Sequence, residues 1–140
     1  SKKEVEKFYD AQRVPNDATP ISYGLNSQLV KENGKIYENV YKSGGLYGEA
    51  IDKIIYWLEK ANAVAENEAQ RNYTNLLIDY YKTGDLKTWD EYNVAWVQDS
   101  VSMIDFVNGF IEDYGDPMGI NKTFFSHQSE RTMVRRQLSC

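Results

Sequence analysis

Two neighbouring stretches with apolar residues at helical spacing constrain the fold of this chain more than any other feature. In residues 48–65 and 67–83, apolar side chains recur at the spacing that forms one stripe along a helix. The stripes consist of Ile51, Ile54, Ile55 and Leu58 in the first stretch and of Tyr73, Leu76, Leu77, Tyr80 and Tyr81 in the second. Only a few polar residues around Glu66 join the two helices, and Gly84 has the place of a glycine that ends the second one. A connection this short predicts an antiparallel helical hairpin.

A β-hairpin is predicted before these helices. Asn33 and Gly34 separate two short strand-like stretches, and both residues tolerate the positive φ angles of a type I′ turn. We therefore expect a hairpin over residues 27–41. Nearer the N-terminus, residues 2–12 have the spacing of a short helix, which a proline-containing connector up to residue 20 separates from the hairpin.

After the helical pair, the sequence predicts a third helix and then a strand. Thr88, with Glu91 three residues later, has the pattern of a capping box and would begin a helix over residues 88–98. The apolar run that follows favours a strand over residues 103–113, with Gly109 at a bulge. Together with the hairpin, these elements predict an α+β fold class that is mainly α.

Charge and length divide the chain into three expected parts. Residues 1–20 would form the N-terminal helix and connector, residues 21–119 a single α+β domain, and residues 120–140 a divergent basic tail. The formal net charge is −5, and the acidic excess lies before the tail. An acidic body argues against nucleic acid as a partner, because phosphate binding needs clustered Lys and Arg. No apolar run approaches the length of a membrane span, so we expect no membrane partner either.

Residues 108–119 carry the sequence N-G-F-I-E-D-Y-G-D-P-M-G. This order resembles dipeptidyl peptidase III, the family of zinc exopeptidases that remove dipeptides from peptide N-termini. The resemblance extends over about residues 21–119 and is closest to bacterial members of the family. It implies a truncated piece of the lobe that faces the zinc lobe across the substrate cleft, in a cytoplasmic enzyme.

The zinc-binding motif of that family is missing from this chain. Family members bind zinc through a helical H-E-x-x-G-H motif and a later glutamate, whereas this sequence has His127 as its only histidine and Cys140 as its only cysteine. A catalytic zinc site needs three protein ligands. We therefore expect no catalytic residue, metal ligand or cofactor in this chain, with zinc held elsewhere in the complete enzyme, and no activity for the chain alone.

Asp105 is the leading candidate for a substrate-binding residue. Aligned on the G-F-I-E segment, it takes the place of an acidic residue that the resemblance assigns to binding the positively charged N-terminus of the peptide substrate. A carboxylate suits this task, because an ammonium group offers three donors and a full charge. The alternative is an outward-facing strand residue that alternates with Ile104 and Phe106.

Asn108 and Gly109 are the other candidate substrate-binding residues. Asn108 could offer a neutral hydrogen-bonding group to the peptide, although an Asn-Gly pair also forms bulges. Many family members have a tyrosine where this chain has Val107. That departure argues against a direct catalytic part for the strand.

An alternative function is an independent protein-interaction module without a peptidase role. The amphipathic helices and the acidic face of the chain would then bind a partner protein. Self-association is a further expectation, because truncation exposes surfaces that a larger protein would cover. No nucleophile–base pair is visible that would support a free-standing hydrolase.

Overall fold

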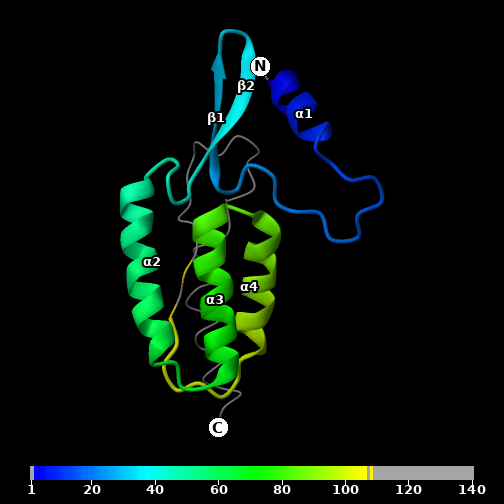
Figure 1. Cartoon of the computed structure of the whole chain (residues 1–140). Coiled ribbons are helices and arrows are strands. Elements are labelled where there is room, and N and C mark those ends of the chain that lie inside the picture. The colour runs from blue at the N-terminus through cyan, green and yellow to red at the C-terminus, as the bar shows by residue number, and fades with distance from the viewer. Residues whose placement is uncertain (1, 107, 109–140) are drawn as a thin grey trace.

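A β-hairpin stands at one end of a layer of packed helices in the computed structural model, which describes residues 2–106 and 108 (Figure 1). The elements follow in the order α1 (Lys2–Asp10), β1 (Ser27–Glu32), β2 (Lys35–Val40), α2 (Gly48–Ala63), α3 (Glu68–Thr83) and α4 (Leu86–Gln98). α3 lies between α2 and α4 and packs against both. The predicted α+β class, mainly α, is confirmed.

The hairpin has the expected two-residue turn. β1 and β2 pair antiparallel, and their last pair, Glu32 with Lys35, leaves only Asn33 and Gly34 in the loop. Both loop residues have positive φ, 49° and 78°, as a type I′ turn requires. The prediction made from these two residues is confirmed.

α3 begins and ends where the sequence indicates. The Asn67 side chain accepts a hydrogen bond of 2.9 Å from the Gln70 amide and so caps the first turn. At the other end, Gly84 has a φ of 74° and donates its N–H to the Tyr80 carbonyl oxygen at 2.6 Å. Gly84 therefore closes the helix, as predicted.

α4 begins earlier than the predicted capping box at Thr88. Asp85 is the N-cap, and its carboxylate accepts hydrogen bonds from the amides of Lys87 and Thr88 at 3.1 and 3.3 Å. The Thr88 hydroxyl donates to the same carboxylate at 2.9 Å. The proposed Thr88–Glu91 box is wrong, because a charged carboxylate one turn upstream already satisfies the first free amides.

The core lies on two faces of α3. On the α4 side, buried side chains form a cluster that consists of Leu25, Tyr73, Leu77, Tyr80, Leu86, Trp89, Tyr92 and Trp96. On the α2 side, a smaller cluster consists of Ile51, Ile55 and Ile78. α3 is therefore the central helix of the fold, and burial of both its faces stabilises the arrangement.

Polar contacts attach the hairpin to its neighbours. The hydroxyl of fully buried Tyr9 in α1 donates to a Glu38 carboxylate oxygen at 2.9 Å. The Asn26 side-chain amide donates to the Gly84 carbonyl oxygen at 2.9 Å, while the Asn26 carbonyl accepts from the Tyr41 amide at 2.8 Å. Asn26 thus connects both ends of the hairpin to the end of α3.

The strand expected over residues 103–113 is absent from the part of it that the structure describes. Residues 103–106 and 108 form no strand. The reason is local: the amides of residues 103 and 104 donate to the side chain of Glu66, before α3, and not to a neighbouring strand. The remaining residues of that prediction, 107 and 109–113, lie outside the described residues.

Candidate functional site

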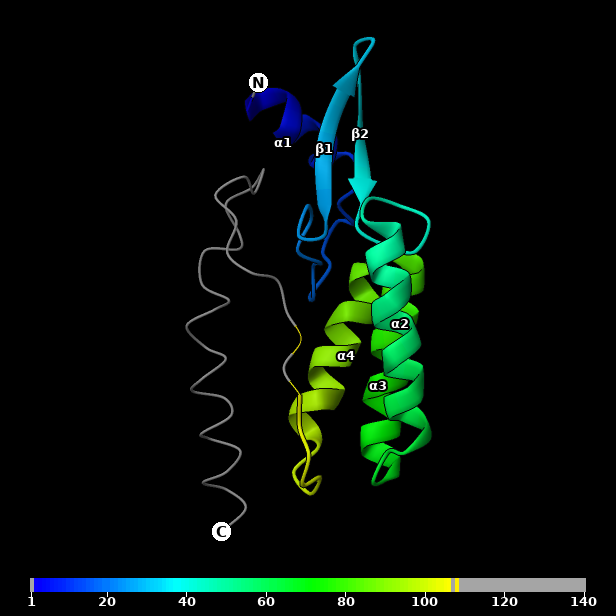
Figure 2. The same cartoon turned by 90° about the vertical axis from the view of Figure 1, so that its left-hand side faces the viewer.

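The segment that carries the predicted substrate-binding residues begins with a tight turn after α4. Buried Asp99 accepts hydrogen bonds from the amides of Val101 and Ser102, both at 3.2 Å, through one carboxylate oxygen. This Asx-type turn reverses the chain. The following residues therefore run back along one face of the helical layer, between α2 and α3 in the view of Figure 1 and at the edge of the layer in Figure 2.

Asp105 is held against α4 by an indole. Trp96 Nε1 donates to Asp105 Oδ1 at 2.8 Å, and the Phe106 amide donates to the same oxygen at 2.9 Å. Asp105 is half-buried. The Phe106 ring packs against the buried Tyr73 ring, with 5.7 Å between their centroids. The carboxylate is thus oriented by two donors, the indole N–H of a residue in α4 and the backbone amide of the next residue.

Asn108 is held by a different helix. The Tyr81 hydroxyl, near the end of α3, donates to Asn108 Oδ1 at 2.8 Å. Burial raises the pKa of Tyr81 above its ordinary value of 10.0, so the hydroxyl stays a donor well above neutral pH. Asp105 and Asn108 therefore belong to one short segment that is anchored on α4 and on α3. Gly109, the third predicted residue, lies outside the described residues.

Three polar side chains at the start of α3 form hydrogen bonds with the segment before Asp105. The two carboxylate oxygens of Glu66 accept from the amides of Met103 and Ile104, at 2.9 and 2.8 Å. Gln70 Nε2 donates to the Ile104 carbonyl oxygen at 2.9 Å. Asn67, which caps α3, also donates through Nδ2 to a serine hydroxyl of the segment, Ser102 Oγ, at 2.8 Å. We call Glu66, Asn67 and Gln70 the clasp.

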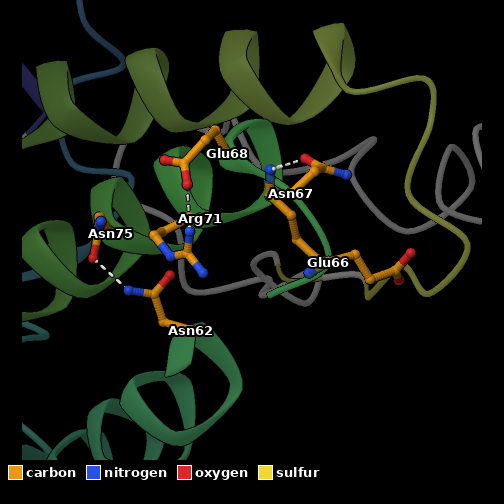
Figure 3. A network of polar contacts seen from close by, with 7 residues as sticks. Asn62, Glu66, Asn67, Glu68, Arg71 and Asn75 are labelled. Atoms are coloured by element: carbon orange, nitrogen blue, oxygen red, sulfur yellow. Dashed lines mark hydrogen bonds and ion pairs between the residues drawn. The ribbon is translucent and has the colours of Figure 1, made fainter. Parts of the chain in front are cut away.

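Figure 3 shows that the Glu66 side chain extends away from α2 and α3 towards the segment that follows α4. The neighbouring pairs in the same view, Glu68 with Arg71 and Asn62 with Asn75, stay within the helical hairpin. In the sequence, Glu66 stands out only as part of the polar connection between the two helices. No local signal could have identified its role, because its partners lie 37 and 38 residues away along the chain.

The clasp is expected to loosen in acid. The amides of Met103 and then Ile104 hold the pKa of Glu66 below its ordinary value of 4.5, although burial and the nearby Asp99 carboxylate oppose them. A pKa lowered by folding means that the stabilisation is present above pH 4.5 and is lost as the pH falls through the folded-state pKa. In an NMR titration, the amide signals of both residues should shift with a midpoint below pH 4.5.

Glu66→Gln provides the control for this titration, because the variant has no carboxyl group at that position. It should abolish the shift of both amides. A midpoint at or above the ordinary pKa in the unmodified chain would contradict the assigned hydrogen bonds, since it would mean that the amides do not favour the charged carboxylate.

A groove of about 470 Å³ lies elsewhere, between α3, α4 and Thr19 of the connector, and includes neither Asp105 nor Asn108. Its lining includes the apolar side chains of Leu76 and Val94 and the carboxylate of Asp90. Burial, with the charge of Asp85, raises the pKa of Asp90. The groove is therefore separate from the segment that carries Asp105 and Asn108.

A profile of peptidase family M49 matches residues 18–130. The match covers most of the chain and includes the whole candidate segment around Asp105. The chain belongs to peptidase family M49. The predicted resemblance to the dipeptidyl peptidase III family is thereby confirmed.

Curated relatives agree with this assignment. This M49 chain is similar to dipeptidyl peptidase 3 of Rattus norvegicus, with 30% identity over 80 residues, and to dipeptidyl peptidase 3 of Homo sapiens, with 31% identity over the same length. Each alignment covers 57% of this chain and 11% of the relative. The chain therefore corresponds to a small part of the relatives it matches.

The zinc ion that the resemblance implies does not fit the described residues of this M49 chain. Within residues 2–106 and 108, no group of three or more His, Cys, Asp and Glu side chains could hold a metal ion. His127 and Cys140 lie outside that range. Because a catalytic zinc needs three protein ligands, we assign no zinc-dependent step to these residues. In the same part of the chain, no helix combines the length and apolar character needed to cross a membrane.

Proposed function

We propose that this chain forms the part of a dipeptidyl peptidase III-like enzyme that binds the amino-terminal end of the peptide substrate. Asp105 would pair with the α-ammonium group, and Asn108 and Gly109 would contact the adjoining peptide. The chain itself would not be catalytic. Membership of family M49 supports the class of substrate, and the position of the candidate residues inside the matched region supports their assignment.

The observation that carries this proposal is the half-buried Asp105 carboxylate with the Trp96 indole bonded to it at 2.8 Å. A carboxylate can accept about four hydrogen bonds, so a ligand ammonium group can join the indole and backbone donors. The indole fixes the carboxylate before the ligand arrives, which reduces the conformational entropy lost on binding. Such a group binds a free peptide N-terminus in preference to a blocked one.

The contribution of such a site to peptidase activity would be positional. Holding the first residue of a peptide places the same peptide bond at the reacting centre in every encounter, and correct placement lowers the barrier of the chemical step. Asn108 follows Asp105 by three residues and directly precedes Gly109. The Tyr81 hydroxyl holds its side chain. Anchoring on two separate helices would hold Asp105 and Asn108 in place for this task.

Isothermal titration of the 140-residue chain with tetra-alanine tests the proposal directly. The peptide with a free N-terminus should bind, and its N-acetylated form should bind at least about tenfold more weakly because a charge-assisted hydrogen bond contributes about 1.5–3 kcal/mol. Asp105→Asn should weaken binding of the free peptide by a similar factor.

Asp90→Asn is the matched control, because it removes a carboxylate from the separate groove. It should leave the affinity unchanged. Equal affinity of the unmodified chain and Asp105→Asn, or loss of binding in Asp90→Asn alone, would refute the assignment of the site to Asp105.

A further inference from the structure

We infer that Glu66 is a positioning residue for the candidate peptide-binding site: by holding the backbone of Met103 and Ile104, it sets the direction in which Asp105 presents its carboxylate. The expected effect of Glu66 on peptide binding rests on the proposed function of Asp105. The expected effect of Glu66 on the orientation of Asp105 rests only on the contacts of the clasp.

The contacts of the clasp hold three successive peptide groups. The two oxygens of Glu66 accept from two successive amides, so the carboxylate fixes the peptide groups that join Ser102 to Met103 and Met103 to Ile104. Gln70 donates to the Ile104 carbonyl oxygen and so holds the next peptide group, the one that leads into Asp105. The same Gln70 side chain accepts from the Glu66 amide at 2.6 Å, which ties the clasp together.

The apolar side chains of the stretch that the clasp holds are exposed. Met103 is 93% exposed and Ile104 is 72% exposed. Burial of these two apolar side chains therefore cannot hold the stretch in place. After Asp105 the situation is reversed, because Phe106 packs against the core. Ahead of Asp105, the polar contacts of the clasp and of the Asp99 turn define the path of the chain.

Glu66 stands directly before the start of the central helix. It precedes Asn67, the N-cap of α3, and its negative charge extends away from the helix towards the amides of Met103 and Ile104, which lower its pKa. The nearby Asp99 carboxylate opposes that charge. A glutamate at this position is thus stabilised in its charged form, the form that accepts both amides, and it connects the start of the central helix to the segment of Asp105.

The test compares Glu66→Ala, Glu66→Gln and Glu68→Gln in the full chain. Glu68 is the matched control, because it lies two residues away and is paired with Arg71, not with the segment. The main readout is the NMR signal of the Trp96 indole N–H, which donates to Asp105. Asp105→Asn marks where that signal lies when the carboxylate is lost.

Glu66→Ala should move the indole signal towards its position in Asp105→Asn and weaken binding of free tetra-alanine by about three- to tenfold. Glu66→Gln should lie between the unmodified chain and Glu66→Ala, because an amide oxygen still accepts hydrogen bonds but carries no charge. Glu68→Gln should change neither the indole signal nor the affinity. A purely structural role for Glu66 would lower the melting temperature without this graded effect on the indole.

An unchanged indole signal in both Glu66 variants would overturn the inference, as would an equal shift in Glu68→Gln. Failure of the proposed function has a different signature. If tetra-alanine does not bind the unmodified chain, or binds Asp105→Asn equally well, the peptide-binding role is lost, while the indole signal still decides whether Glu66 positions Asp105. If Glu66→Ala does not fold, the comparison of Glu66→Gln with Glu68→Gln decides the question.

Discussion

Replacing Leu77 with alanine is expected to lower the free energy of unfolding by about 2–5 kcal/mol, the range for a large-to-small change in a packed core. Leu77 is 0% exposed in the cluster between α3 and α4. The truncated side chain would lose its burial and leave a cavity among aromatic rings that cannot easily close it. Urea unfolding followed by circular dichroism measures the effect.

Leu76→Ala is the matched control for this prediction, because the residue type and the helix are the same. Leu76 is only partly buried against the cluster and lines the groove that includes Asp90. Its truncation should cost clearly less than that of Leu77, since solvent already reaches the site. Equal losses for the two variants would contradict the assignment of the core to this face of α3.

Replacing Gly84 with alanine is expected to destabilise the fold by about 2–5 kcal/mol, because two separate costs add. A non-glycine residue at a φ of 74° costs about 1–2 kcal/mol. In addition, a Cβ there would approach Val40 Cγ1 to 2.7 Å, and such overpacking costs about 1–3 kcal/mol. The Gly84 carbonyl also accepts the Asn26 bond that attaches the hairpin, so the damage falls on the junction between hairpin and helices.

Gly44→Ala separates the two costs. Gly44 has a φ of 68°, but a Cβ there would meet nothing within 4 Å. Its loss in urea unfolding should therefore reflect backbone strain alone and remain below that of Gly84→Ala. In the double variant, Val40→Ala should recover part of the Gly84→Ala loss, because it removes the atom that clashes. Purely additive losses in the double variant would show that the clash does not occur.

The candidate site was only partly predictable. Asp105 and Asn108 could be named in advance because a short sequence pattern carried the family resemblance, and the family is confirmed over that region. The donors that hold them, Trp96 and Tyr81, could not be named, because helical spacing identifies Trp96 and Tyr81 only as packing residues. The role of Glu66 could not be named either, because a contact between residues 37 positions apart leaves no local pattern.

The sequence by itself determined the elements whose causes are local. Asn33 and Gly34 specify a turn with positive φ angles, two apolar stripes specify a helical pair, and Gly84 specifies its end, because each depends on neighbouring residues only. Where two local signals competed, the sequence did not show which one would win. Asp85, and not Thr88, is the N-cap of α4.

Only the tertiary structure decided the path of the segment around Asp105. Its apolar alternation predicted a strand, but a strand needs a partner for its amides, and in the described residues 103 and 104 those amides bind Glu66. A backbone donor binds the acceptor that folding brings within reach. Which acceptor that is depends on how α3 and α4 pack together, and no stretch of the sequence contains that information alone.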